Sequence, residues 1–343
     1  MSASSTVEQK SAANDPAQGI LRQKGTPDVV VYVEAERDAT AMIGHAKALA
    51  AAFGANILLV SVIEPTEAGV SAVDPVDWDI RRREVSRHLT DLAKKFGSEK
   101  LEIRNRVLEG HPADQICRCV AKKSNDIMVI QCAPGFGRWP AGAAARGAMA
   151  SDVAAILAIP THYSGQTVPA YSRVFVPLDG SANAESAIPK AARLAKAHGA
   201  ELLLCHVTPE PVLTEIGPAD AETIRLKERI ARHNERAGKS YLNRVKDRLK
   251  ECDVPVSVRL FADGDPRRSL VSAIAREAVD IVVMAAHGQS GHADVTNGDV
   301  AGFILDRSSV PVLVTRQPQG RRAEHIFHDA RPEGVRHRID LEQ

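Results

Sequence analysis

The chain is poor in aromatic residues and contains no long apolar run. Aromatic side chains make up 4% of its 343 residues, too few for the stacking surfaces that bind single-stranded nucleic acid. No apolar run approaches the roughly 18–20 residues that span a bilayer. Residues 1–26 are polar and small and lack the continuous apolar segment of a secretory signal. We therefore expect a cytoplasmic protein with a disordered leader over 1–26.

Cysteine and net charge exclude further classes. The five cysteines form no CxxC pair. An odd count in a long chain argues against a disulfide framework, so reduced thiols are expected. The formal net charge is +1, which gives no general reason to expect a nucleic acid or an anionic membrane as partner.

The sequence does contain a repeated alternation of short apolar runs and helical patterns. The first half starts with the run Val29–Val33 and the second with Val174–Leu178. In each half, five strand-like runs alternate with helix-like stretches, and such runs are typical of buried strands. The alternation predicts an α/β fold with two tandem, doubly wound, five-stranded, parallel-sheet (Rossmann-like) domains.

Matching residues at regular offsets mark the repeat. The pairs are Gly110 and Gly264, Asp126 and Asp280, Gly147 and Gly298, and Pro160 and Pro311. The first two pairs are 154 residues apart and the last two are 151 apart. Regular offsets across several elements indicate a duplication more strongly than any single motif. We place the first domain at 27–165, the second at 172–316 and a disordered tail at 317–343.

Two local expectations follow from the same patterns. A helix is predicted over Ser181–Ala197, with Pro189 inside it at a local cost. In the first half, helical apolar spacing runs to Ala158, and the last strand is predicted at Thr161–Ser164.

Candidate ligand-binding residues lie where the predicted strands of the second half end. In doubly wound sheets, ligands bind at the carboxyl ends of the strands, where the strand order reverses. Asp179, Val207, Gly264 and the loop Met284–Gly291 lie at these ends and are expected to converge on one pocket. A glycine loop before a helix also offers backbone N–H groups to an anion.

These residues resemble the universal stress protein family. The resemblance covers nearly all of 28–316 as two copies and is clearer in the second, which carries VPLDGS at Val176–Ser181 and MAAHG at Met284–Gly288. It implies a non-catalytic, stress-response regulatory protein that binds an adenine nucleotide (ATP, or ADP/AMP), with Mg as a possible companion. It also implies that the two domains pair within the chain through Val310–Thr315 and Thr161–Ser164. A homodimer is possible too, and neither nucleic acid nor membrane is an expected partner.

The family resemblance assigns roles to individual residues. ATP-binding members carry G-x-x-G, nine residues, then Gly-Ser/Thr. Carried over, Asp179 is the adenosine-side carboxylate, and Pro177 and Val207 line the base pocket. The remaining nucleotide-binding positions are Leu178, Gly264, Met284, Ala285, Gly288, Gly291, Gly298, Asp299 and Val300.

This chain departs from the family motif at two places in the second half. Ala285 stands at the first glycine, and Asp299 stands at the Ser/Thr. A carboxylate beside a triphosphate sets like charges together, which implies weak ATP binding or a preference for ADP or AMP. The first half departs further, with Glu34 for the aspartate, Pro134 in the loop and Ala148 at the Ser/Thr. We expect it to keep the fold without a normal site.

Other interpretations remain open at this point. Asp179 and Asp299 are also suited to capping helices. His287 and His292 lack a third metal ligand, and the charged helix Arg225–Lys250 is most simply a solvated face. A scaffold or signalling module without nucleotide is one alternative function. An ATP-using enzyme on a related fold is another, but the histidine pair or Ser-Gly-Gly loop of such enzymes is missing after both first strands.

Overall fold

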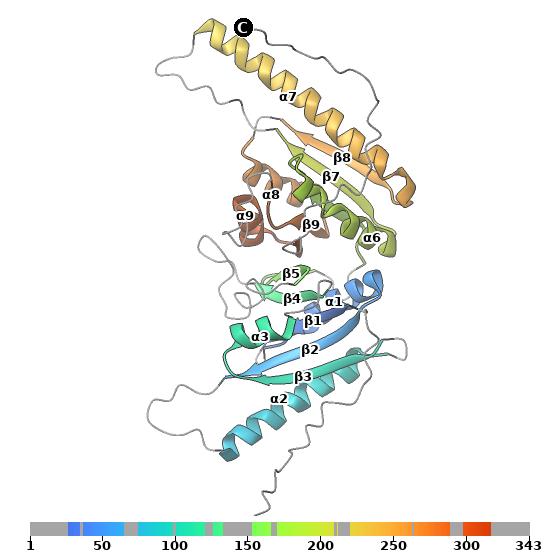
Figure 1. Cartoon of the computed structure of the whole chain (residues 1–343), viewed down its shortest axis with the longest axis vertical. Coiled ribbons are helices and arrows are strands. Elements are labelled where there is room, and N and C mark those ends of the chain that lie inside the picture. Colours follow the sequence, from blue (N-terminus) through green and yellow to red (C-terminus); the bar gives the residue numbers. More distant parts are fainter. Residues whose placement is uncertain are drawn as a thin grey trace, which may run out of the picture.

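The computed structural model describes residues 27–34, 37–64, 75–98, 101–120, 126–132, 153–165, 170–208, 211, 220–262, 264–288 and 298–316. Ten strands form one continuous sheet in the order β3-β2-β1-β4-β5-β10-β9-β6-β7-β8 (Figure 1). The predicted leader 1–26 and tail 317–343 lie outside the described residues.

Each half of the chain contributes five strands. The first half supplies β1 (Asp28–Tyr32), β2 (Asn56–Ile63), β3 (Ile103–Glu109), β4 (Ile127–Cys132) and β5 (Ala155–Pro160). The second supplies β6 (Arg173–Pro177), β7 (Glu201–Val207), β8 (Val256–Phe261), β9 (Ile281–Ala285) and β10 (Val312–Thr315). All pairs within a half are parallel. The strand order 3-2-1-4-5 occurs twice, which confirms the predicted doubly wound fold class.

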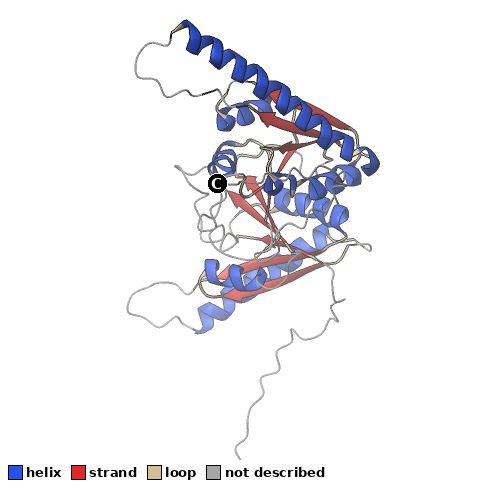
Figure 2. Ribbon diagram, turned by 45° about the horizontal axis from the view of Figure 1, so that its top comes forward, coloured by secondary structure: helices blue, strands red, loops and turns tan. Residues whose placement is uncertain are grey.

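Helices cover both faces of the sheet (Figure 2). One core packs under α1 (Thr40–Phe53), α2 (Pro75–Phe96), α5 (Ala182–Glu185), α6 (Ile188–His198) and α7 (Ala221–Arg248). The other packs under α3 (Pro112–Val120), α8 (Pro266–Arg276) and α9 (Asp299–Arg307). Each core includes residues of both halves, so burial of apolar surface stabilises the halves together.

The two halves join through one antiparallel pair, β5 with β10. Leu157 lies opposite Leu313 at the centre of this pair. Within their own halves, Leu157 is the partner of Val129 and Leu313 is the partner of Val283. Leu157 and Leu313 are therefore equivalent positions facing each other, and a pseudo-two-fold axis passes between them. The pseudo-dimer predicted within the chain is present.

The predicted pairing segment of the first half is wrong. Thr161–Ser164 follows the strand, and Ala155–Pro160 makes the pair, whereas the prediction for Val310–Thr315 is confirmed over Val312–Thr315. Every residue of β5 is buried, so its sequence shows no alternation and its alanines suggested a helix instead. The match of Pro160 with Pro311 misled the register, because Pro160 ends β5 and Pro311 precedes β10.

The predicted helix Ser181–Ala197 is two helices. Ser181 caps α5 by accepting a hydrogen bond from the Ala184 N–H, and α6 begins at Ile188 with Pro189 in its first turn. In the first turn the missing N–H of proline costs nothing, since no helical partner exists for it. Pro189 therefore starts a helix rather than straining one.

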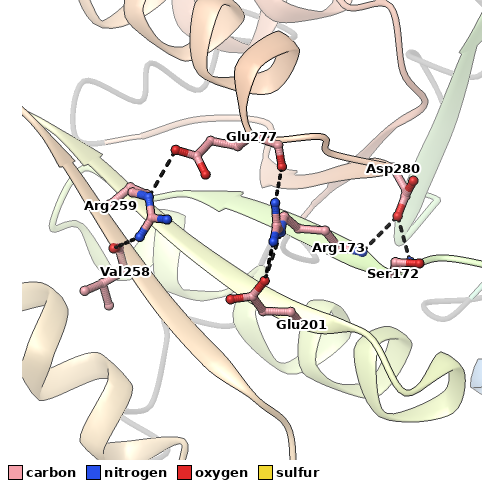
Figure 3. Close-up of polar contacts among 7 residues, drawn as sticks. All are labelled: Ser172, Arg173, Glu201, Val258, Arg259, Glu277 and Asp280. Carbon is pink, nitrogen blue, oxygen red and sulfur yellow. Dashed lines mark hydrogen bonds and ion pairs between the residues drawn. The ribbon is translucent and has the colours of Figure 1, made fainter.

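Aspartates tie the strands together at the amino end of the sheet (Figure 3). Asp280, before β9, accepts hydrogen bonds from the backbone N–H groups of Ser172 (2.6 Å) and Arg173 (2.8 Å) at the start of β6. Its counterpart Asp126 accepts from the N–H of Asp28 at 3.0 Å. The Asp126–Asp280 repeat thus has a structural cause, at the edge opposite the candidate site.

Candidate functional site

The end of β6 is held in place from β7. The Leu178 N–H donates to the Cys205 carbonyl at 2.7 Å, and the His206 ring Nδ1 lies 2.7 Å from the Leu178 carbonyl. A carbonyl only accepts, so Nδ1 carries the proton in this contact. Pro177 and Leu178 are both buried. The next residue, Asp179, is exposed at a fixed place on the carboxyl edge.

Asp179 forms a tight turn into the following helix. Its Oδ1 accepts from the Ser181 N–H at 2.9 Å and from the Ser181 hydroxyl at 2.6 Å. Ser181, not Asp179, is the N-cap of α5. The turn orients one carboxylate oxygen toward the chain and leaves Oδ2 directed toward the loop after β9.

Gly288 lies against the Asp179 carboxylate. A Cβ atom built on Gly288 would stand 2.1 Å from Asp179 Oδ2, closer than any real contact, so only glycine fits unless the carboxylate moves. The Asn183 side-chain amide reaches the Gly288 carbonyl at 3.4 Å. β6 and β9 are neighbours in the sheet, and the chain leaves them in opposite directions. Asp179 and Gly288 therefore meet at the switch point of the second half.

The amino end of α9 is fixed to the same loop. Gly298 is its N-cap residue, and the Gly298 N–H donates to the Ala286 carbonyl at 2.9 Å. Asp299, suggested as the cap, instead occupies the first turn, where a carboxylate interacts favourably with the helix dipole. Asp265 first, and Asp299 after it, raise the pKa of Arg267. The Arg267 guanidinium thus stands near enough to the Asp299 carboxylate for the two charges to interact.

The other predicted residues occupy neighbouring positions. A Cβ on Gly264 would lie 2.4 Å from Ser269 Oγ and 4.0 Å from Val207 Cγ1, so the ends of β7 and β8 approach each other there. Met284 is buried with 6% of its surface exposed; Ala285 and Val300 are half-buried. Gly291 lies outside the described residues.

Three contributors were missed by the sequence argument. His206 on β7 and Asn183 on α5 hydrogen-bond to the site, and Arg267 on α8 lies near enough to Asp299 for their charges to interact. Asn183 had a usable signal, because it stands four residues after Asp179 in the first helical turn. His206 had none, because its partner Leu178 lies 28 residues away, and the fold alone brings Arg267 near Asp299.

Helix α7 adds a phenol behind this edge. The Tyr241 ring packs edge-on to the His206 ring, with centroids 5.9 Å apart. Burial first, and the negative charges of Glu185 and Asp179 after it, raise the pKa of the Tyr241 hydroxyl well above its usual value. The Arg248 guanidinium contacts Glu185 at 2.7 Å. The Asp179 carboxylate thus belongs to a locally acidic group.

The equivalent edge of the first half is built differently. Glu34 stands at the position of Asp179. Asp28 pairs with the first residue of β2, and Arg173 pairs with the first residue of β7. Glu34 and Asp179 each lie six residues after these equivalent positions. Its carboxylate contacts the Arg37 guanidinium at 2.8 Å. The aspartate–hydroxyl turn occurs four residues later, where Asp38 Oδ1 accepts from the Thr40 N–H (2.9 Å) and hydroxyl (2.5 Å).

The remaining first-half assignments, at Pro134, Gly147 and Ala148, lie outside the described residues. Within the described ranges, no group of three His, Cys, Asp or Glu side chains is arranged to hold a metal ion. Over the same ranges, every helix is too short or too polar to cross a bilayer.

Comparison with known proteins identifies the same pattern in both halves. The sequence model of the universal stress protein family matches residues 26–146 and again 170–316. Universal stress protein YxiE of Bacillus subtilis is 26% identical over 148 residues, covering 43% of this chain and 99% of that protein. A universal stress protein structure from Archaeoglobus fulgidus is 17% identical with a TM-score of 0.60, covering 86% of this chain and 97% of that one. That structure resembles this chain in fold across both halves.

Proposed function

The chain belongs to the universal stress protein family, and from this premise we propose that it is a stress-response regulatory protein whose second domain binds an adenine nucleotide. The observation that carries the proposal is the approach of Gly288 to Asp179, where a Cβ would lie 2.1 Å from Oδ2. The backbone of Gly288, which has no side chain, thus lies beside the Asp179 carboxylate at the switch point. Doubly wound sheets bind ligands at this place.

Each part of the site has a distinct task in this proposal. Asp179 Oδ1 accepts from Ser181, which fixes the carboxylate at the switch point, where it accepts a hydroxyl of the nucleoside. The first turn of α9, together with Gly288 at the end of the described part of the loop after β9, presents N–H groups to the phosphates. Pro177 and Val207, buried at the ends of β6 and β7, flank the base.

The charge of the first turn of α9 selects the nucleotide. Asp299 is exposed there and repels each added phosphate. Arg267 offsets part of this charge, and Mg²⁺ supplied with the nucleotide offsets more. We propose that affinity falls from AMP or ADP to ATP in the absence of Mg²⁺.

The first domain does not bind nucleotide in this proposal. The Glu34 carboxylate forms an ion pair with Arg37 at 2.8 Å, which competes with a nucleoside hydroxyl for it. The first domain serves instead as the fixed partner of the second across β5 and β10.

Calorimetric titration of the whole protein with AMP, ADP and ATP tests this function. Asp179→Asn should weaken binding about 10- to 100-fold, the effect of losing a hydrogen bond to a charged acceptor. Asp38→Asn is a matched control, because Asp38 makes the same turn with Thr40 in the other domain, and it should leave affinity unchanged.

Two results would contradict the proposal. Absence of binding at millimolar nucleotide would leave a nucleotide-free scaffold as the function. Rapid Mg²⁺-dependent turnover of ATP would instead indicate an enzyme.

A further inference from the structure

Helix α7 consists of two unlike parts. Its carboxyl-terminal part lies on the sheet and buries Gly238, Leu242 and Val245. Its amino-terminal part, 221–237, contains no buried residue, and Figure 1 shows it extending past the ends of β7 and β8. A helical arm that buries so little of itself is not explained by the packing of this domain.

Local interactions keep the arm helical. Asp220 caps it by accepting from the Thr223 N–H at 2.7 Å. Glu228 and Arg232 form an i,i+4 pair at 3.7 Å. Both interactions are of the kind that stabilise exposed helices by a few tenths to about 1 kcal/mol. These local contacts support the arm as an exposed, rod-shaped helix.

Four arginines line one side of this rod. They are Arg225, Arg229, Arg232 and Arg236, named here the arginine ridge, and all are exposed. Their spacing of four, three and four residues places them in one row, which at 1.5 Å per residue is about 16 Å long. Within the described part of the chain, only Arg232 of the four has an ion-pair partner.

The ridge faces away from the protein body. Residues buried on the sheet, at 238, 242 and 245, project from the opposite side of the helix by the 100° step between residues. The exposed apolar side chains Ile224 and Leu226 flank the row instead of lying in it. The outward surface thus carries a straight row of four arginines, with Glu228 beside it as the ion-pair partner of Arg232.

We propose that the arginine ridge docks on the phosphate backbone of a double-stranded nucleic acid without reading its sequence. Guanidinium groups bind phosphate oxygens in pairs, and a straight row of them matches a regular line of phosphates. Aromatic side chains for stacking on single strands are missing from 221–237. An apolar face for insertion into a membrane surface is not available either, because the exposed Ile224 and Leu226 of the arm lie on opposite flanks of the row.

The whole-chain charge hides this feature. A net charge of +1 gave no reason to expect an anionic partner, but a cationic row attracts one through its local field. The equivalent helix α2 shows the contrast. Its arginines Arg81, Arg82, Arg83 and Arg87 point to several sides of the helix, because three of them are consecutive.

Fluorescence anisotropy with a labelled 30-base-pair duplex of random sequence tests the proposal. The unchanged full-length protein should bind with an affinity that falls with salt at a log–log slope of about −3.6, from about −0.9 per phosphate contact and four contacts. The variant R225Q/R229Q/R232Q/R236Q should bind at least tenfold more weakly at 50 mM salt and lose most of this slope.

The matched control removes the same charge from α2. R81Q/R82Q/R83Q/R87Q should bind the duplex within about twofold of the unchanged protein, and an equal loss in both variants would overturn the proposal. Three further results would overturn the proposal. They are failure of the protein to bind the duplex at 50 mM salt, binding of polyglutamate as tight as that of the duplex, and binding of phosphatidylserine vesicles but not of the duplex.

Circular dichroism of the variants checks that α7 persists. The four substitutions lie outside the packed part of α7, so the helical signal should be kept. If it is not, R225K/R229K/R232K/R236K keeps the charge and should retain the affinity and the slope. Loss of binding in this folded lysine variant, or a slope shallower than about −2 in the unchanged protein, overturns the assignment to phosphates.

Discussion

At the residue scale, His45 is a buried titratable group at the junction of the two domains. Its side chain lies on α1 with no exposed surface. Its Nδ1 is 2.7 Å from the Tyr171 hydroxyl, and its ring packs between those of Tyr163 and Tyr171, with centroids 5.1 and 5.8 Å away. Burial lowers the pKa of His45 from 6.5 to about 4. The histidine is therefore neutral in the folded protein at neutral pH.

This burial makes stability depend on pH in a predictable direction. Below about pH 6.5 His45 is protonated in the unfolded state, but in the folded state it stays neutral down to about pH 4. The free energy of unfolding therefore falls as the pH falls through this window. The loss approaches about 3 kcal/mol at its lower end. Urea unfolding at pH 7 and pH 5 should show a smaller difference for His45→Gln than for the unchanged protein. The exposed His88, changed to Gln, is the control, and equal pH dependence in both variants would contradict the prediction.

A site residue could be predicted from the sequence only where its role depends on its own place in the chain and not on a partner from another element. Asp179 and Gly288 could be located from the sequence, because both follow apolar, strand-like runs whose carboxyl ends bind ligands in doubly wound sheets. His206 hydrogen-bonds to the backbone carbonyl of Leu178. Every residue has such a carbonyl, so the sequence gives no sign of this contact. Arg267 pairs with its neighbour Asp265, and only the fold brings it near Asp299.

At the element scale, strand existence was more predictable than strand limits. Alternating or β-branched runs such as β1 and β6 were located almost to the residue. The prediction of β5 was wrong because this strand is central in a ten-stranded sheet and buried on both faces. Its sequence therefore shows no alternation of apolar and polar residues. The prediction of one helix across Pro189 was wrong because proline, which usually breaks helices, lies here in the first turn of α6.

The amino-end aspartates make a testable contribution to the strand ends (Figure 3). Asp280→Ala removes the acceptor of two backbone N–H groups, at 2.6 and 2.8 Å, and frees the start of β6 beside the Arg173–Glu201 pair. We expect it to lower the free energy of unfolding by about 2 kcal/mol, measured by urea denaturation. Asp91→Ala is the control, because Asp91 is exposed on α2. A loss no larger than that of the control would show that the Asp280 contacts are dispensable.

At the scale of the whole molecule, the duplication turns a two-fold interface into an internal one. Leu157 and Leu313 face each other on the pseudo-axis, and α1 packs against α6 beside it. Arg193 of α6 donates to the Ala52 carbonyl of α1 at 2.9 Å. Each half therefore leaves an edge strand and a helix face uncovered when it is alone.

A fragment comprising only residues 166–343 should consequently form a homodimer. The β10 strand of a second copy takes the place of β5 in the same register, with Leu313 opposite Leu313, which gives a closed, isologous pair. Size-exclusion chromatography with light scattering should find twice the fragment mass, whereas the full-length chain keeps β10 paired with its own β5. Leu313→Asp in the fragment places a carboxylate on the axis opposite its copy and should abolish the dimer. A folded fragment that stays monomeric up to about 100 µM, a concentration at which edge pairing of this kind normally associates, would show that the β10 edge is protected by other means.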